Sequence, residues 1–171
     1  MFQRVNIFRF SILAVIAIIA TFFHPVSVFA DLPTDSYFAE FFNNRSLRDA
    51  PVLTRQDQGI DFNWGSGSPG PGVNSDYFSA RWTKVTHFDA GSYEFSVTAD
   101  DGVRLYIDGE LIIDKWIDQG PTTYTVTKTL TAGDHSIRME YYEHWAGAVA
   151  KLKITALVVT PPPPPNVLVG A

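Results

Sequence analysis

The chain has 171 residues, with 13 Lys and Arg, 18 Asp and Glu and no Cys, and its formal net charge is −5. An acidic chain without a cluster of basic residues is not expected to bind nucleic acid or anionic lipid. Because there is no cysteine, a disulfide framework is excluded, and a hydrophobic core has to stabilise the fold.

The first 30 residues have the order of a secretory signal peptide. Arg4 and Arg9 precede an apolar run at 11–23, and Val28 and Ala30 are small residues at the −3 and −1 positions of a cleavage site. The run is shorter than the ~20 residues that span a bilayer, which favours cleavage over a retained membrane anchor. We expect a secreted, extracellular protein cut after Ala30, with no membrane insertion after cleavage. Removal of these residues takes away two Arg and no acid, and leaves 11 basic and 18 acidic residues.

Short segments of strand character follow. Residues 37–42 are aromatic, and Asn43-Asn44 is a turn signal. Residues 45–60 show little periodicity and are expected to form a loop with at most a short strand at Val52-Leu53. The glycine- and proline-rich residues 65–72 predict a surface loop. They are not expected to bind phosphate, because no helix follows them.

The central stretch 91–116 has the clearest pattern. Residues 93–99 alternate between apolar and polar side chains, as do residues 103–107, which is the two-residue period of strands with one buried face. Asp100-Asp101-Gly102 separates them, and Asp108-Gly109 is typical of a type I′ hairpin. The pattern predicts a β-meander with two adjacent carboxylates at its first corner.

The same alternation recurs at 78–82, 124–130, 137–142 and 148–154, and no segment after residue 30 shows a helical period. Many short strands separated by turns predict an all-β fold, a sandwich or a barrel. The five prolines of 161–165 predict an extended polyproline spacer within a tail at 158–171.

Together these segments resemble the PA14 domain family, named for anthrax protective antigen. The matching segments, in the family's order, are Tyr37–Asn44, Ile60–Gly65, Asp76–Thr83, Gly91–Gly109, Trp116, Ala132–His135 and Met139–Glu143 before Lys151-Leu152. The resemblance covers 35–157 and implies an antiparallel, jelly-roll-like β-sandwich. It also implies a non-catalytic binding module, most often for carbohydrate.

Asp100 and Asp101 lie on a motif that holds calcium in the family's adhesins. There, two consecutive aspartates joined by a cis peptide bind the ion, and the ion binds sugar hydroxyls. Calcium prefers six to eight oxygen ligands, which paired carboxylates help to supply. The alternative is that Asp-Asp-Gly only makes a turn, since Asp side chains bond nearby amides and Gly tolerates positive φ. The metal-site candidates are therefore Asp100 and Asp101.

The loop 143–147 is the second candidate region. In the sugar-binding adhesins a second loop gives an Asn side chain to the ion, whereas this loop has none, so Glu143 or backbone carbonyls would take its place. Trp145 is the best candidate for a platform on which a sugar ring stacks, and its alternative role is to cap one end of the sandwich. His144 completes the candidate ligand-binding residues, although a lone His in a polar loop is more often simply solvated.

Other aromatic residues are weaker candidates for the platform. They are Tyr106 and Trp116, while Trp64 and Trp82 follow the strand period and are expected in the core.

An enzyme is not expected, because neither a G-x-S-x-G motif nor a cysteine nucleophile is present. A hydrolase is the third hypothesis, and its pair of carboxylates would have to come from a small set. That set is Asp100, Asp114, Asp118, Glu140 and Glu143. The leading hypothesis is a secreted, lectin-like module that binds a glycan or a cell-surface or extracellular polysaccharide, with calcium as the expected cofactor. The alternative is a protein-interaction or structural module of an extracellular or cell-surface assembly.

Overall fold

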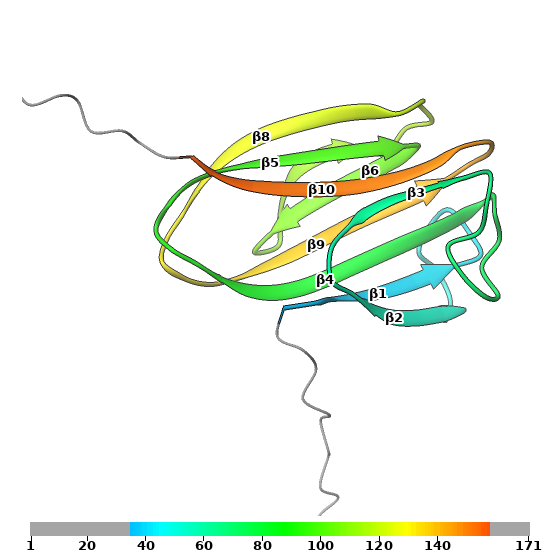
Figure 1. The fold of residues 1–171 in the computed structure, drawn as a ribbon, viewed down its shortest axis with the longest axis horizontal. Coiled ribbons are helices and arrows are strands. Elements are labelled where there is room, and N and C mark those ends of the chain that lie inside the picture. The colour runs from blue at the N-terminus through cyan, green and yellow to red at the C-terminus, as the bar shows by residue number, and fades with distance from the viewer. Residues whose placement is uncertain (1–34, 158–171) are drawn as a thin grey trace, which may run out of the picture. The chain divides into compact units, whose positions relative to one another are not determined.

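The computed structural model describes residues 35–157, which form ten β-strands and no helix (Figure 1). The strands are β1 (Tyr37–Phe42), β2 (Leu53–Asp57), β3 (Asp61–Gly65), β4 (Phe78–Phe88), β5 (Gly91–Asp100), β6 (Gly102–Ile107), β7 (Glu110–Lys115), β8 (Thr122–Leu130), β9 (Gly133–Glu143) and β10 (Ala148–Leu157). Among these residues there is therefore no helix that could cross a membrane. The predicted signal peptide and the proline-rich tail lie outside the described residues.

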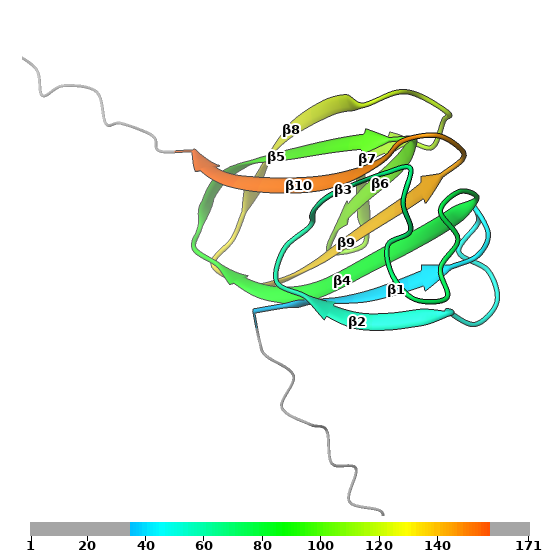
Figure 2. The same cartoon turned by 45° about the vertical axis from the view of Figure 1, so that its right-hand side comes forward.

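The strands form two antiparallel sheets, packed as the two layers of a sandwich (Figures 1 and 2). One sheet has six strands in the order β2-β1-β4-β9-β6-β7, and the other has four in the order β3-β10-β5-β8. The predicted all-β sandwich is confirmed.

The core lies between the layers and follows the predicted alternation. Phe95 and Val97 of the four-stranded sheet are fully buried, as are Trp82, Leu105 and Tyr141 of the six-stranded sheet. Burial of side chains of this size stabilises a fold by roughly 1.5–3 kcal/mol each relative to exposure. The prediction that Trp82 belongs to the core is confirmed.

Trp64 was also expected in the core, and it packs against it while remaining partly exposed. Its ring stacks on Phe62 with a centroid distance of 5.0 Å, and it meets Phe78 edge to face at 5.7 Å. These contacts place it at the margin of the core.

The expectation for residues 45–60 is wrong in part, because β2 extends to Asp57. Its inward side chains are Leu53, Arg55 and Asp57. The last two are joined by a 2.7 Å ion pair, and the Arg55 guanidinium lies 4.7 Å from the centroid of the Phe41 ring. An edge strand that covers the core with an ion pair and an arginine has no apolar alternation. Its pattern therefore gave no strand signal.

The predicted meander is also wrong at its first corner. β5 pairs with β10 and β8, whereas β6 pairs with β9 and β7, so the chain changes sheets at Asp101. At this corner Gly102 passes directly against a ring, because a Cβ there would lie 2.1 Å from Cε1 of Tyr142. The hairpin at Asp108-Gly109 is as predicted, with φ of 52° and 79°.

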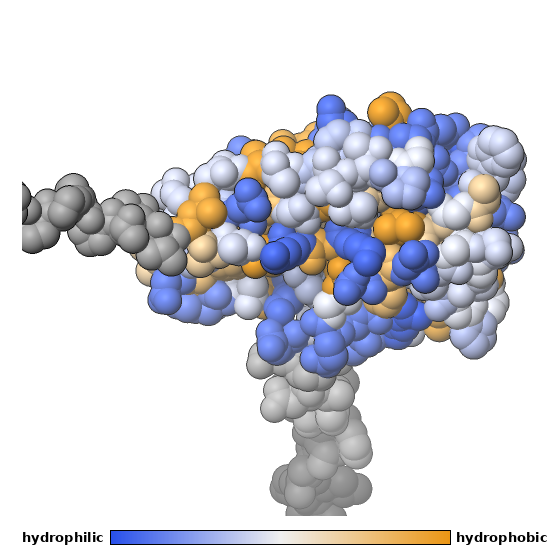
Figure 3. All heavy atoms as spheres, turned by 45° about the horizontal axis from the view of Figure 1, so that its top comes forward, coloured by the Kyte–Doolittle hydropathy of each residue, from blue (hydrophilic) through white to orange (hydrophobic). Residues whose placement is uncertain are grey.

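All odd-numbered strands run toward one end of the sandwich, at the right in Figure 1. The β5–β6, β7–β8 and β9–β10 connections therefore gather at that end. In the view of Figure 3, hydrophobic residues are scattered among hydrophilic ones without one continuous apolar patch. Scattered exposed apolar residues are normal, so that view indicates no large apolar docking surface.

Candidate functional site

Three carboxylates from two loops meet at this end of the sandwich. One oxygen each of Asp100, Asp101 and Glu143 lies within 4.8 Å of the others. Asp100 ends β5, Glu143 ends β9, and the peptide bond between Asp100 and Asp101 is cis. The cluster brings together the two sequence-predicted metal ligands with Glu143.

Asp101 is buried and its carboxylate is fixed by two backbone amides. Its Oδ1 accepts a 2.8 Å hydrogen bond from the amide of Gln119, and its Oδ2 accepts one of the same length from the amide of His144. The Gln119 side chain also donates to the Asp101 carbonyl at 3.0 Å. One carboxylate therefore holds the β7–β8 and β9–β10 loops together.

Glu143 is a buried carboxyl with incomplete hydrogen bonding. Its Oε2 accepts a 2.9 Å bond from the Tyr141 hydroxyl, which also donates to the Asp100 carbonyl. Its Oε1 is buried and has no hydrogen-bond partner among the described residues. Burial, followed by the charges of Asp101 and Asp100, raises the pKa of Glu143 to about 8, although the bond from Tyr141 acts in the other direction. A partner that favours the charged form of Glu143, such as a cation, would offset this cost of burial.

Asp100 is the more open member of the cluster. Desolvation raises its pKa, and so does the charge of Asp101. Gly147 lies against it, because a Cβ at that position would be 3.3 Å from Asp100 Oδ2. The absence of a side chain at Gly147 thus lets the β9–β10 loop approach this carboxylate closely.

A hollow of about 380 Å³ adjoins the cluster and is lined by residues of three loops. These are Asp100, Asp101, Asp118, Gln119, Gly120, Trp145, Ala146 and Gly147. Trp145 is 67% exposed, so it does not cap the core. The acidic corner and the aromatic tip therefore line the same hollow.

His144 contributes mainly through its position. Its imidazole Nδ1 lies 2.7 Å from Asp118 Oδ2, and its ring meets Tyr77 edge to face with a centroid distance of 5.0 Å. Together with its backbone bond to Asp101, these contacts orient the loop that carries Trp145. The prediction named His144 as a ligand-binding residue, and the structure places it beside the hollow's lining residues.

Asp118 and Gln119 were missed as binding-site residues. Asp118 accepts a 2.6 Å hydrogen bond from the Tyr142 hydroxyl and pairs with Arg45 at 3.4 Å. Hydrogen bonding from Tyr142 and His144 lowers the pKa of the Asp118 carboxyl against the opposing effect of its desolvation. The only signal in the sequence was two polar residues before the Gly120-Pro121 turn, which many surface loops share.

The remaining sequence candidates lie on the outer face of the six-stranded sheet. Asp114 and Glu140 are engaged with Arg104, at 3.5 and 3.3 Å. Trp116 and Tyr106 are each covered by a guanidinium group, from Arg104 at 4.1 Å and from Arg138 at 3.9 Å to the ring centroids. Neither ring lines the hollow beside Asp100 and Asp101.

The cluster has the chemistry of a site for a hard divalent cation. Calcium takes carboxylate and carbonyl oxygens in a flexible geometry, and three carboxylates supply both the charge and several oxygens. The buried Oε1 of Glu143, without a partner among the described residues, is the observation that favours an ion over a simple turn. The Asp101 carboxylate does not make the local bond of the turn hypothesis, since its oxygens accept the amides of Gln119 and His144, 18 and 43 residues away.

Comparisons with known proteins agree with this architecture. The anti-sigma-I factor RsgI3 of Acetivibrio thermocellus is 43% identical over 115 residues, which are 66% of this chain and 18% of that protein. A solved anti-sigma factor domain-containing protein is 37% identical with a TM-score of 0.66, and the match covers 70% of this chain and 42% of the other. This chain thus spans less than half of either relative.

A third similarity concerns the fold alone. The PA14 sugar-binding domain from an RTX adhesin is 22% identical with a TM-score of 0.57, covering 72% of this chain and 90% of that one. A family model described as "PA14 domain" matches residues 35–165. The match covers more than half of the sequence and agrees with the ten-stranded sandwich, and the chain therefore belongs to the PA14 domain family.

Proposed function

We propose that this protein is a non-catalytic carbohydrate-binding module whose ligand binds in the hollow between Asp100, Asp101 and Trp145. The observation that carries the proposal is that Asp100 and Asp101 of the carboxylate cluster and an exposed tryptophan line one hollow at one end of the sandwich. The similarity in fold to an adhesin domain described as sugar-binding supports it.

Asp100, Asp101 and Glu143 would hold a calcium ion in this site. When bound, calcium supplies a positive charge and open coordination positions that sugar hydroxyls can occupy. The protein's own part is to keep the carboxylates converged. Gln119 and His144 do this through their amide bonds to Asp101, and Tyr141 does so through its bond to Glu143.

Trp145 would supply the apolar half of the site. The C–H face of a pyranose ring packs on an indole, which offers a large rigid surface at a small cost in side-chain entropy. Its exposure of 67% means that most of this surface is accessible before a ligand arrives.

The geometry does not favour hydrolysis. Glycosidases place their two carboxyl groups about 5–5.5 Å or 6.5–9.5 Å apart on either side of the scissile bond. Here one oxygen of each of the three carboxylates lies within 4.8 Å of the others, so they converge on one point, and Asp101 and Glu143 are buried. Crowded, buried oxygens are suited to bind a cation, whereas a glycosidase needs an acid and a base that face the substrate from two sides.

A glycan array probed in calcium and again in EDTA tests the proposal. We expect binding in calcium that is lost in EDTA and lost in Asp101→Asn, while circular dichroism shows an intact fold. An array without hits in calcium, or hits that are the same in EDTA and in Asp101→Asn, would contradict it.

A protein-binding module is the second candidate. Two relatives at 43% and 37% identity are named as anti-sigma factor proteins, so related domains occur in proteins named for regulation. This candidate predicts no glycan hits and no change in melting temperature with calcium. In either case we propose that the domain acts outside the cell, and N-terminal sequencing of the secreted protein, expected to begin at Asp31, tests that.

A further inference from the structure

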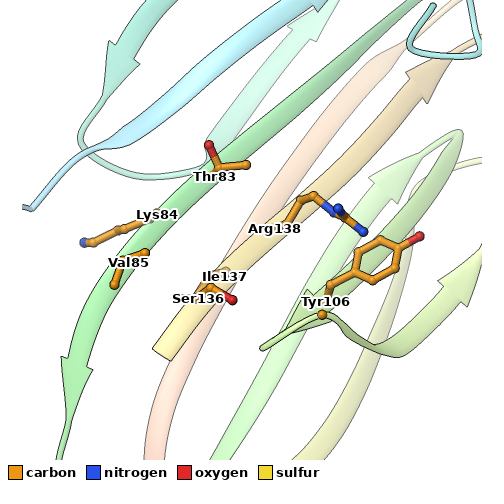
Figure 4. Close-up of a pocket in the computed structure, with 8 residues that line it drawn as sticks. Thr83, Lys84, Val85, Tyr106, Ser136, Ile137 and Arg138 are labelled. Carbon is orange, nitrogen blue, oxygen red and sulfur yellow. The ribbon is translucent and has the colours of Figure 1, made fainter. Parts of the chain in front are cut away.

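A second hollow, of about 360 Å³, lies on the outer face of the six-stranded sheet (Figure 4). Its walls come from three neighbouring strands, with Thr83 and Val85 on β4, Ser136 and Arg138 on β9 and Tyr106 on β6. It lies toward the opposite end of these strands from the carboxylate cluster, next to the β6–β7 turn.

Three arginines on this face share one buried carboxylate. Glu140 lies 3.3 Å from Arg104, 3.5 Å from Arg138 and 3.9 Å from Arg81. Glu140 itself is only 7% exposed, so these contacts occur where water screens little. Glu140 therefore divides its charge among three guanidinium groups.

Two of these arginines have a carboxylate of their own. Arg81 pairs with Glu40 at 3.1 Å, and Arg104 pairs with Asp114 at 3.5 Å. Within residues 35–157, Arg138 has no carboxylate besides its share of Glu140. Arg138 is therefore the arginine whose single carboxylate is shared with two others and lies 3.5 Å away, and it is a wall of the hollow.

Arg138 is also the arginine with unused donors. Its side chain makes no hydrogen bond to any described residue, and its buried Nε has only the 3.5 Å ion pair with Glu140. Its guanidinium carbon lies 3.9 Å from the centroid of the Tyr106 ring, and Figure 4 shows the side chain extended toward that ring. Stacking holds the planar group in one orientation, and its fork of donors matches the two oxygens of a carboxylate.

The other charged groups around the hollow are already neutralised. The Lys84 ammonium is bound to Asp35 at 2.8 Å. The Asp108 carboxylate, on the turn, accepts the Ser136 amide at 2.8 Å and lies 2.6 Å from His135 Nδ1. A ligand in the hollow would therefore encounter Arg138 as the charged side chain with unused donors among the described residues that line it.

The other walls of the hollow indicate which kind of ligand would present a carboxylate to Arg138. Its strands β4, β9 and β6 are interior strands of the sheet, so their backbone groups are already paired and an extended peptide cannot add as a further strand. Side chains must hold the ligand. Thr83 and Ser136 offer hydroxyl groups, and Val85, 62% exposed, offers an apolar surface. Hydroxyl partners beside a small apolar surface suit a sugar ring.

We propose that this hollow is a second ligand site, which binds the carboxylate group of an acidic sugar through Arg138. Thr83 and Ser136 contact the sugar hydroxyls, and Tyr106 positions the guanidinium. The site does not depend on the proposed calcium site, which lies at the other end of the sheet.

The test is a calorimetric titration of the purified protein with a uronic acid oligosaccharide in EDTA. EDTA removes calcium, so the ligand cannot bind through a calcium ion at Asp100 and Asp101. Three comparison ligands separate the sources of the anion, namely the neutral oligosaccharide of the same linkage, propionate and sulfate. We expect the acidic sugar to bind and the other three to bind at least about tenfold more weakly.

Two variants remove the site in different ways. Arg138→Gln removes the charge and keeps the length of the side chain, and Val85→Glu places a carboxylate on the exposed wall. Both should weaken binding of the acidic sugar about tenfold or more. Lys153→Gln is the control, because it removes one positive charge from β10 of the other sheet and leaves Glu140 and its three arginines unchanged. It should bind as the unchanged protein does.

The outcomes are separable. No binding of the acidic sugar in EDTA, or binding that survives both variants in proteins with unchanged melting temperatures, overturns the site. Equal binding of propionate or sulfate overturns its assignment to a sugar. An Asp101→Asn protein that loses neutral glycans in calcium but retains the acidic sugar in EDTA supports both sites independently.

Discussion

The amide of His144 donates a 2.8 Å hydrogen bond to Oδ2 of Asp101, and this bond fastens the loop after β9 to the corner where the chain changes sheets. Oδ1 of the same carboxylate accepts the amide of Gln119. Three loops that are distant in sequence are thus held by one buried side chain. The proposed ligand site consequently depends on a residue that also stabilises the fold.

Replacement of Asp101 by Asn should therefore affect both stability and metal binding. An amide group has one acceptor oxygen, so one of the two backbone amides loses its partner. The free energy of unfolding should fall by about 1–3 kcal/mol in urea denaturation with EDTA. Any rise of melting temperature with calcium should disappear. Asp61→Asn is the control, because Asp61 forms a surface pair with Lys151 at 2.8 Å, and its effect should stay within about 0.5 kcal/mol.

Glu143→Gln should separate stability from metal binding. The neutral amide removes the cost of a buried carboxyl whose Oε1 has no partner among the described residues. The free energy of unfolding of the variant, measured in EDTA at neutral pH, should therefore be about 1–3 kcal/mol higher than that of the unchanged protein. Calcium affinity, measured by calorimetry, should fall at the same time. A variant that is less stable and binds calcium equally well would show that Glu143 serves packing alone.

Gly102→Ala should strongly destabilise the domain. The new Cβ would lie 2.1 Å from Cε1 of Tyr142, whose ring also packs on Trp116 and whose hydroxyl binds Asp118. Displacement of that ring should lower the free energy of unfolding by about 2–3 kcal/mol. Gly59→Ala is the matched control, since nothing lies within 4 Å of a Cβ there. Equal melting curves for the two variants would contradict the contact.

The pair of His135 and Asp108 should make stability depend on pH. Hydrogen bonds to Asp108 and to the Thr131 carbonyl raise the pKa of His135 above 6.5, and the bond from His135 lowers that of Asp108 below 3.8. The contribution of His135 is complete below pH 6.5 and is lost as the pH rises through its folded pKa. That of Asp108 is present above pH 3.8 and is lost as the pH falls through its own folded pKa.

Melting temperatures measured across this range test the pair. The difference between the unchanged protein and His135→Gln should be largest between about pH 4 and 6.5 and should shrink toward pH 9. A difference that grows as the pH rises would contradict the assignment. A proton NMR titration of the His135 ring gives its folded pKa directly.

Trp145→Ala should reduce glycan binding without affecting the fold. The side chain is 67% exposed, so its removal should change stability by less than about 0.5 kcal/mol. Loss of the stacking surface should weaken the glycan found on the array about tenfold. Ile117→Ala removes an apolar side chain of similar exposure, 54%, from the β7–β8 loop and should leave affinity unchanged.

Much of the fold could be predicted because each strand carries its pattern locally. Phe95 and Val97 alternate with polar residues whether or not their partner strands are known, and Asp108-Gly109 specifies its turn within two residues. The exception is β2, where Arg55 covers the aromatic core with its guanidinium. Its role depends on rings from Phe41 and Phe62, which the local pattern cannot show.

The site was predictable only where residues are adjacent in sequence. Asp100 and Asp101 were identified from their motif, and Glu143 and Trp145 from their loop. Asp118 and Gln119 were not recognised as part of the binding site, because their importance arises from hydrogen bonds to Asp101, Tyr142 and His144, which lie 18, 24 and 26 positions away. The arginine hollow on the outer face was invisible for the same reason, since its walls lie on three strands.

The sequence by itself determined an all-β fold with an acidic corner and an aromatic residue in a loop, because side-chain periodicity and turn chemistry act over a few residues, and the family resemblance favoured a sandwich over a barrel. The tertiary structure alone decided that the chain changes sheets at Asp101, that Glu143 joins the two aspartates, and that Arg138 shares its one carboxylate with two other arginines. These relationships arise from pairing between distant strands, and the packing of two sheets sets them.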